Sequence, residues 1–295
     1  MNGVISVVGH VALDYLFNVE KITDSNESSP IINYEILFGG GAANVAAAIA
    51  KLGGEVELIA PIGTDFESSG YKAQLESFGV DLTSLYPIEK KETVKVFVFT
   101  DKEHNQSSYF YWGASSEFKN LTPRKCDFVH LSTADPTFNS KISKISNFVS
   151  FDPGQDLVIY SKEQLKAILE NTDILFANRH ELKRMCDMTG FTHSEFKDMI
   201  EIMVITYDSK GSMLYTKGEQ HKIPIVSVDA VDPTGAGDGY RAGFLVAYKK
   251  GYPLITCCKI GSTVASFMVE KQGCQTNLPT WDIMETRFKE NFGEL

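Results

Sequence analysis

The feature that most restricts the fold is a regular alternation of short β-branched runs with amphipathic segments in the second half of the chain. Stretches with apolar residues at helical spacing separate the runs, which fall at residues 128–131, 148–151, 174–177 and 203–206. Strands that alternate with helices in this way are typical of a parallel sheet with helices on both faces. Strand-like residues 5–8 and 55–59, with an Ala-rich helix predicted over 44–52, extend the pattern to the N-terminal part.

A different pattern at 93–112 predicts a β-hairpin. Residues 93–100 and 107–112 are strand-like and are joined by the polar stretch 101–106. Side chains alternate between the two faces of a strand, and here both faces are apolar: Val94, Val96 and Val98 against Lys95, Phe97 and Phe99, then Tyr109 and Tyr111 against Phe110 and Trp112. Apolar faces are costly to leave in water, so we expect both to be covered.

Composition excludes several classes of function. The 295 residues are 43% hydrophobic, enough for one large domain or two average ones. The formal net charge of −10, without a basic stripe, argues against a nucleic-acid partner. The five cysteines form no C-x-x-C motif, and no apolar stretch approaches the roughly 20 residues of a membrane helix. These features predict a reduced, cytoplasmic protein with no membrane partner.

The segment Asp232-Pro-Thr-Gly-Ala-Gly-Asp238 combines a phosphate site with a base. A strand predicted at 223–228 precedes it and a helix predicted at 240–250 follows it, so its Gly-Ala-Gly run falls at a helix start. Free N–H groups and the helix dipole favour an anion there. Asp238 would repel a phosphate, so we interpret it as a group that takes a proton from an attacking hydroxyl. The alternative is a glycine-rich turn in which Asp238 only stabilises the first helical turn.

Three sequence blocks in order carry a family resemblance. They are the segment 232–244 that begins with the motif above, the glycine-rich block 38–46 (Phe-Gly-Gly-Gly-Ala-Ala-Asn-Val-Ala), and Asn-Arg-His-Glu at 178–181. Together they resemble the signatures of the ribokinase (PfkB) family of sugar and nucleoside kinases, over essentially the whole chain. The resemblance implies one ribokinase-like α/β domain over 1–295: a central, mostly parallel sheet with helices on both faces, plus a small β-sheet lid formed by about 12–35 and 86–112.

The resemblance also assigns roles at the acceptor site. Asp238 is the expected catalytic base, and the N–H groups of Gly235, Ala236 and Gly237 are the expected anion hole. Asp14 is expected to bind sugar hydroxyls, because it matches the Gly-x-x-x-x-Asp position that begins at Gly9. We expect the substrate to be bound also by Gly39, Gly40 and Asn44. A further candidate is His10, whose role is open. The glycine run nearly matches a dinucleotide-binding fingerprint, but Asn44 replaces the third glycine.

On the donor side the resemblance implies ATP and Mg²⁺. Asn178 and Glu181 are expected to order the magnesium, mostly through water, and Asn178 also lies near the nucleotide. Thr206 and Gly211 fit the nucleotide loop of the family, although Asp208 stands where that loop has its first glycine. Asp232 is a candidate ligand of a monovalent cation such as K⁺.

The resulting functional hypothesis is an ATP-dependent nucleoside kinase that phosphorylates the ribose 5′-hydroxyl of inosine, guanosine, adenosine or cytidine. Segments 9–17, 151–156 and 273–281 look similar to broad-specificity nucleoside kinases of archaea. The aromatic residues of the hairpin could stack on a base or form the core of the lid, which could also pair with a second subunit in a homodimer. Alternatives are a ribokinase- or fructokinase-type sugar kinase of the same family, and a catalytically silent nucleoside- or sugar-binding protein.

Overall fold

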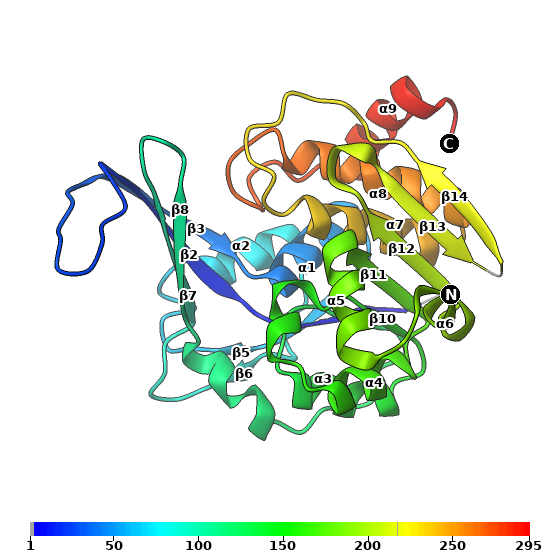
Figure 1. The fold of residues 1–295 in the computed structure, drawn as a ribbon, viewed down its shortest axis with the longest axis horizontal. Coiled ribbons are helices and arrows are strands. Elements are labelled where there is room, and N and C mark those ends of the chain that lie inside the picture. The colour runs from blue at the N-terminus through cyan, green and yellow to red at the C-terminus, as the bar shows by residue number, and fades with distance from the viewer. Residues whose placement is uncertain (1–2, 217) are drawn as a thin grey trace.

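The computed structural model describes residues 3–216 and 218–295 and contains the predicted α/β architecture (Figure 1). The main sheet has eight strands in the order β14-β13-β12-β11-β10-β9-β1-β4. The strands from β4 to β12 are parallel, whereas β13 and β14 run antiparallel at one edge. Their bounds are β1 (Ile5–Val8), β4 (Val56–Ile59), β9 (Val129–Leu131), β10 (Val149–Phe151), β11 (Ile174–Asn178), β12 (Ile202–Thr206), β13 (Ser212–Thr216) and β14 (Glu219–Ile223).

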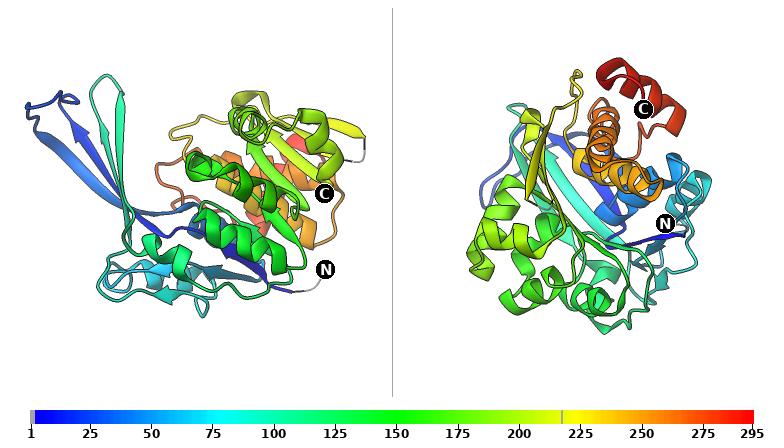
Figure 2. Two further views of the ribbon diagram at one scale, coloured as in Figure 1. Left: turned by 60° about the horizontal axis from the view of Figure 1, so that its bottom comes forward. Right: turned by 90° about the vertical axis from the view of Figure 1, so that its right-hand side faces the viewer.

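Helices cover both faces of this sheet (Figure 2). Two separate hydrophobic clusters fill the two interfaces, and adjacent strand residues such as Val7 and Val8 point into different clusters because side chains alternate along a strand. One face carries α1 (Gly41–Lys51), α2 (Tyr71–Phe78), α7 (Ala236–Lys249), α8 (Leu254–Met268) and α9 (Trp281–Phe292); the other carries α3 (Pro136–Ile145), α4 (Lys162–Leu169), α5 (Arg179–Thr189) and α6 (His193–Met199). No helix in the described ranges is long and apolar enough to cross a membrane.

A second, four-stranded sheet forms the lid, and its strands project from the body of the molecule (Figure 2, left). Its order is β3-β2-β7-β8, with β2 (Ala12–Val19), β3 (Ile31–Gly39), β7 (Val94–Thr100) and β8 (Gln106–Tyr111). The predicted hairpin is therefore confirmed. The central pair, β2 with β7, is parallel and starts with Ala12 opposite Val94. A small pair, β5 (Pro61–Ile62) with β6 (Tyr86–Pro87), lies near the base of the lid.

The prediction of a strand at 223–228 is wrong. β14 ends at Ile223, and residues 224–230 form an irregular connection to the glycine-rich segment. Pro224 has no N–H to continue the ladder with β13, and its carbonyl accepts a hydrogen bond from Ser262 Oγ on α8 at 3.1 Å. The following helix, α7, begins earlier than predicted, at Ala236.

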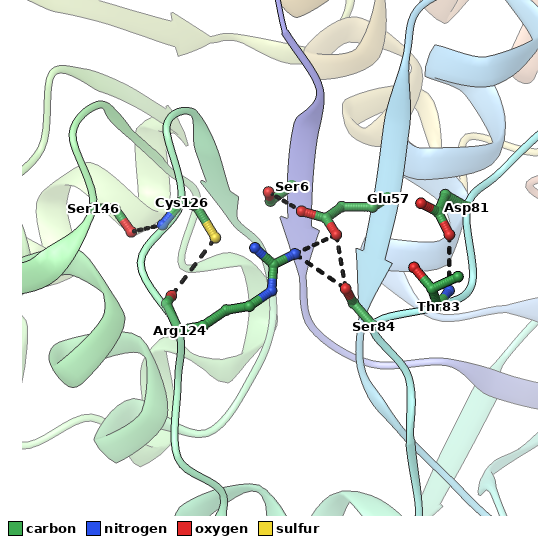
Figure 3. A network of polar contacts seen from close by, with 8 residues as sticks. All are labelled: Ser6, Glu57, Asp81, Thr83, Ser84, Arg124, Cys126 and Ser146. Atoms are coloured by element: carbon green, nitrogen blue, oxygen red, sulfur yellow. Dashed lines mark hydrogen bonds and ion pairs between the residues drawn. The ribbon is translucent and has the colours of Figure 1, made fainter.

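A polar network anchors the edge strand β4 (Figure 3). The side chain of Glu57 accepts hydrogen bonds from Ser6 Oγ on β1 at 2.5 Å and from Ser84 Oγ at 2.7 Å, and it pairs with Arg124. Burial alone would raise the pKa of Glu57, but these three hydrogen bonds and the positive charge of Arg124 outweigh burial, so the net pKa is lowered. The network therefore joins two strands and two loops through one carboxylate.

Replacing Glu57 should lower the free energy of unfolding. We expect Glu57→Ala to cost about 1–3 kcal/mol near pH 7, because the buried Ser6 hydroxyl and the half-buried Ser84 hydroxyl lose their acceptor and Arg124 loses its partner. The pKa is lower in the folded state, so the stabilisation is present above the unfolded pKa of about 4.3 and is lost as the pH falls through the folded pKa. Urea unfolding at pH 7 and pH 3.5 checks both points, with the exposed Glu76→Ala as a control; an equal loss at both pH values would contradict the ionic part of the argument.

Candidate active site

A cleft of about 720 Å³ lies between the lid and the loops that follow the parallel strands. In open α/β sheets ligands bind at this edge, because the strands end there and the helices that follow begin there. The lid contributes valines, aromatic residues and the carboxylate of Asp14, whereas the sheet side contributes the other carboxylates. Predicted site residues that line the cleft are His10, Asp14, Gly40, Asn44, Glu181, Asp232, Gly235, Gly237 and Asp238; Gly39, Ala236, Asn178, Thr206 and Gly211 do not line it.

The glycine-rich loop ends as predicted at the start of a helix. Gly235 is the N-cap of α7 with a φ of 79°, a left-handed conformation that favours glycine. A Cβ at this position would lie 2.8 Å from Cys274 Sγ, so close packing also requires glycine. Ala236 N–H donates to Pro233 O at 3.3 Å, whereas the first N–H groups of a helix generally lack partners within it. The loop thus presents backbone N–H groups to the cleft beside Asp238 in the first turn.

Asp238 is held by residues from two helices. Its Oδ2 accepts a hydrogen bond from Asn44 Nδ2 of α1 at 2.9 Å, and its Oδ1 pairs with Arg241 Nη1 of α7 at 3.0 Å. Burial raises the pKa of Asp238, and the contacts with Arg241 and Asn44 oppose that rise without cancelling it. A buried carboxylate with a raised pKa suits the transfer of a proton from a hydroxyl.

Asn44 has a different neighbourhood from the one predicted. Its Nδ2 is bound to Asp238, and its Oδ1 accepts from Gln275 Nε2 at 3.0 Å. Gln275 Nε2 also donates to the hydroxyl of Tyr71, at 2.6 Å. Asn44 therefore links Asp238 to a buried amide and phenol in addition to facing the cleft. Gln275 and Tyr71 have no recognisable motif, and sequence reasoning missed them.

Asp14 reaches the cleft from β2 in the lid. Burial, with a smaller contribution from the charge of Asp238, raises the pKa of Asp14 to about 7. A Cβ on Gly39 would lie 2.0 Å from Asp14 Oδ2, so the first glycine of the pair makes room for this carboxylate. Gly40 has a φ of 95°, and its Cβ would lie 2.4 Å from His10 O. Steric room for the Asp14 carboxylate and for the backbone at His10 therefore requires both glycines.

His10 is fixed on both sides of its ring. Its Nε2 lies 2.9 Å from Asp156 Oδ2, and its Nδ1 lies 2.9 Å from Ser115 Oγ. The ring of Trp112 lies 5.3 Å away, centroid to centroid, at a tilted angle. This arrangement places an oriented imidazole on the cleft wall next to the lid, and Asp156 was not among the predicted site residues.

The donor-side residues meet at the ends of β11 and β12, where Asn178 and Thr206 are register partners. Asn178 Oδ1 accepts from the N–H groups of His180 and Glu181, and Glu181 Oε2 accepts from Asn178 N at 2.7 Å. Such a reciprocal pair is a capping box, which by itself stabilises the start of α5. Glu181 nevertheless also lines the cleft.

The loop that was predicted to bind the nucleotide has Asp208 in place of its first glycine. Asp208 has a φ of 53°, the left-handed conformation that glycine usually supplies. Its carboxylate pairs with Arg179 at 3.2 Å. Gly211 has a φ of 90°, and a Cβ there would lie 2.1 Å from Ile223 O. Gly211 therefore allows β14 to pack closely against this loop.

The lid aromatics divide between the two faces of the lid sheet. Phe110 and Trp112 line the cleft together with Val94, Val96 and Val98. The other rings form a row of contacts on the opposite face, in which Tyr15 stacks with Phe97, Phe17 stacks with Phe99 and Tyr34, and Tyr109 meets Phe99 edge to face. Phe17 also borders the cleft. Of the aromatic residues considered for base stacking, Phe97, Phe99 and Tyr109 therefore belong to the outer layer of the lid.

Arg241 and Asp152 complete the site, and the sequence analysis assigned neither a role. Arg241 Nη2 pairs with Asp152 Oδ2 at 2.7 Å, and both side chains are largely buried. Asp152 directly follows β10, and Arg241 comes three residues after Asp238, on the same face of α7. That i, i+3 spacing was the available signal for the pairing of Arg241 with Asp238.

Comparison with known proteins agrees with this geometry. The sequence profile of the pfkB family carbohydrate kinases matches residues 4–281. A nucleoside kinase from Methanocaldococcus jannaschii is 47% identical over 293 residues (97% of each chain), and one from Methanothermobacter thermautotrophicus is 42% identical over 296 residues (97% of this chain, 96% of that one). The crystal structure of a Methanocaldococcus jannaschii nucleoside kinase, an archaeal member of the ribokinase family, gives a TM-score of 0.94 at 46% identity, covering 97% of this chain and 98% of that one. The predicted kinase class is confirmed, and this chain belongs to the pfkB family of carbohydrate kinases.

Proposed function

We propose that this protein is an ATP-dependent kinase that phosphorylates the 5′-hydroxyl of nucleosides. The observation that carries the proposal is the position of Asp238, a buried carboxylate at a helix start that faces a cleft bordered by an apolar lid. The names of the two archaeal relatives, which cover almost the whole chain, support a nucleoside as the acceptor.

The reaction follows from the placement of these groups. Asp238 takes the proton of the acceptor hydroxyl while the oxygen of that hydroxyl attacks the γ-phosphorus of ATP. The bond from that phosphorus to the oxygen that bridges the β- and γ-phosphates breaks, and ADP leaves. The N–H groups of Gly235 and Gly237, which line the cleft, stabilise the charge on the transferred phosphoryl group, whereas the N–H of Ala236 donates to Pro233 O. Closure of the lid excludes water, which would otherwise compete with the nucleoside as acceptor.

The acceptor site is proposed to bind ribose through Asp14, Asn44 and the backbone of Gly39 and Gly40. An ionised carboxylate can accept two hydroxyl hydrogen bonds, as a 2′,3′-diol requires. His10 and Trp112 lie on the wall beside the lid, where a base would stack on the indole and face an oriented imidazole. The apolar valine face above them tolerates different bases, which supports a range of nucleosides that includes inosine, guanosine, adenosine and cytidine.

The donor side is proposed to hold ATP near Thr206, Gly211 and Asn178. Among the residues that the structure describes, no group of three or more His, Cys, Asp or Glu side chains could hold a metal ion. Glu181 at the cleft fits a Mg²⁺ that is bound mainly by nucleotide phosphates and water, and this ion would offset the phosphate charge. Asp232, whose oxygens accept from the N–H groups of Thr234 and Gly273, is the proposed ligand for K⁺.

The first experiment measures ADP release from Mg·ATP with inosine, guanosine, adenosine, cytidine, ribose and fructose as acceptors. We expect turnover on several nucleosides and little on the free sugars, because the lid wall offers apolar surface to a base that a free sugar lacks. Turnover on a sugar alone would replace the proposal with a sugar kinase. Nucleoside binding without ADP release from any acceptor would indicate a silent binding protein.

Asp238→Asn should leave the fold intact and lower kcat by at least ~10²-fold, the lower range for the loss of a general base. Steady-state ADP release on the best nucleoside measures the effect, and thermal unfolding checks the fold. Asp282→Asn is a matched control, because Asp282 is likewise in the first turn of a helix but is exposed on α9, away from the cleft. Near-normal turnover of Asp238→Asn would remove the assignment of the base.

The outer face of the lid is the proposed surface for a homodimer. It exposes large apolar side chains on β3 and β8 to water, two of them from the row of ring contacts described above: Ile32 (52% exposed), Tyr34 (60%), Ile36 (48%) and Tyr109 (62%). A patch of this kind usually marks an interface. Two copies of the same lid face would cover each other with identical chemistry, as a two-fold interface requires.

Substituting this face should separate the subunits. We expect the double variant Tyr34→Glu with Tyr109→Glu to elute as a monomer in size-exclusion chromatography with light scattering, whereas the wild type is a dimer. Ile283→Glu, an exposed apolar site on α9, serves as the control and should stay dimeric. A wild type that is monomeric at concentrations up to ~100 μM, a weak affinity for a stable interface, would refute this surface.

A further inference from the structure

Arg241 occupies a position between two carboxylates. Its Nη1 pairs with Asp238 Oδ1 at 3.0 Å and its Nη2 with Asp152 Oδ2 at 2.7 Å, so the two ends of one guanidinium hold the two acids. The three side chains are at most 15% exposed. Arg241 also lies against the anion-hole loop, since a Cβ on Gly237 would come within 2.8 Å of Nη1. The guanidinium therefore contacts the base, the loop and a residue that follows β10.

The surroundings of Asp238 are otherwise acidic or neutral. Two other carboxylates feel the charge of Asp238. It raises the pKa of Asp14, which lies on the lid strand β2, and the pKa of Asp152, which follows β10. Glu181 on α5 is a further negative charge, which raises the pKa of Asp152 and of Arg241. Tyr71 on α2 and Cys274 next to the loop have raised pKa values, for which burial is the main cause, and remain neutral. Arg241 is thus the cation that offsets this acidic cluster.

Resting on the proposed function, we propose that Arg241 is a positioning residue for phosphoryl transfer: anchored by Asp152, it fixes the Asp238 carboxylate through Oδ1 and stabilises its negative charge, which leaves Oδ2 to take the proton of the acceptor hydroxyl. Asn44 donates to Oδ2 from the opposite side, and together the two contacts define the plane of the carboxylate. An arginine suits this place better than a lysine, because its planar guanidinium can bind two carboxylates at once in fixed directions.

This role predicts a specific change in the pH profile. Arg241 lowers the pKa of Asp238 against the larger effect of burial. Without Arg241 the pKa of Asp238 rises, so the ionised base is present only at higher pH, and the acid limb of kcat moves upward. Each pH unit by which the acid limb moves lowers kcat tenfold at pH values below the limb. At pH values above the limb, kcat recovers.

The test compares Arg241→Met, Asp152→Asn and the double variant that combines them, with saturating ATP and the nucleoside that the wild type phosphorylates, from pH 5.5 to 9.5. We expect Arg241→Met to shift the acid limb of kcat upward by about one unit or more, with a loss of ~10-fold or more at the acid end that recovers at high pH. The same shift should separate the double variant from Asp152→Asn. This second comparison remains valid if Arg241→Met alone misfolds, because the double variant leaves no buried Asp152 carboxylate without its partner.

Two controls make the outcome decisive. Arg241→Lys should shift the limb less than Arg241→Met, because it keeps the charge but loses the fork. Arg287→Met removes an ion-paired arginine of α9 that does not line the cleft and should not move the limb. A loss of kcat that is equal at all pH values, or a rise in KM for ATP without a displaced limb, would overturn the positioning role. Absence of wild-type turnover on every nucleoside would instead refute the proposed function, so the two failures are distinguishable.

Discussion

Burial of several carboxylates at the carboxyl edge of the main sheet is the constraint on which the rest of the site depends. Asp14, Asp152 and Asp238 come from the lid, the sheet and α7, and the guanidinium of Arg241 pairs with two of them. A buried charge without a partner is expensive. The fold meets this cost by bringing α1 and α7 together, so that Asn44, Gln275 and Tyr71 form a chain of hydrogen bonds behind Asp238.

The lid sheet has one face toward the cleft and one face away from it, and the side chains along each strand alternate between these two faces. Val94, Val96, Phe110 and Trp112 face the cleft, while aromatic rings from all four lid strands contact one another in the opposite layer. A period of two along each strand produces this division without any change in composition. The same strands thus border the cleft on one side and present a large apolar surface on the other. The proposed closure of the lid over the substrate and the proposed association of subunits would therefore involve the two faces of one sheet.

Much of the architecture could be predicted, because local patterns determine it. The β-branched runs fall on β9 to β12, the hairpin was found, and the glycine-rich motif correctly located the start of a helix. The strand at 223–228 failed because a β-branched composition was given more weight than the missing N–H of Pro224. Asp152, Gln275 and Tyr71 were missed because their roles come from side-chain pairs between distant parts of the chain. Arg241 was missed although its i, i+3 spacing from Asp238 was a local signal. Asn178 and Glu181 show a further limit, since one spacing serves both a helix cap and a proposed metal site.

The parallel pairing of β2 with β7 has a consequence for how the chain folds. A hairpin can form locally, but parallel strands need a crossover, and here the segment between Val19 and Val94 includes β3, α1, β4 and α2. Closing that long loop costs entropy before any contact in the lid repays it. We therefore expect the two lid hairpins to join only after the main sheet has brought their bases together. The part of the molecule that covers the substrate would then be among the last to assemble and the first to open.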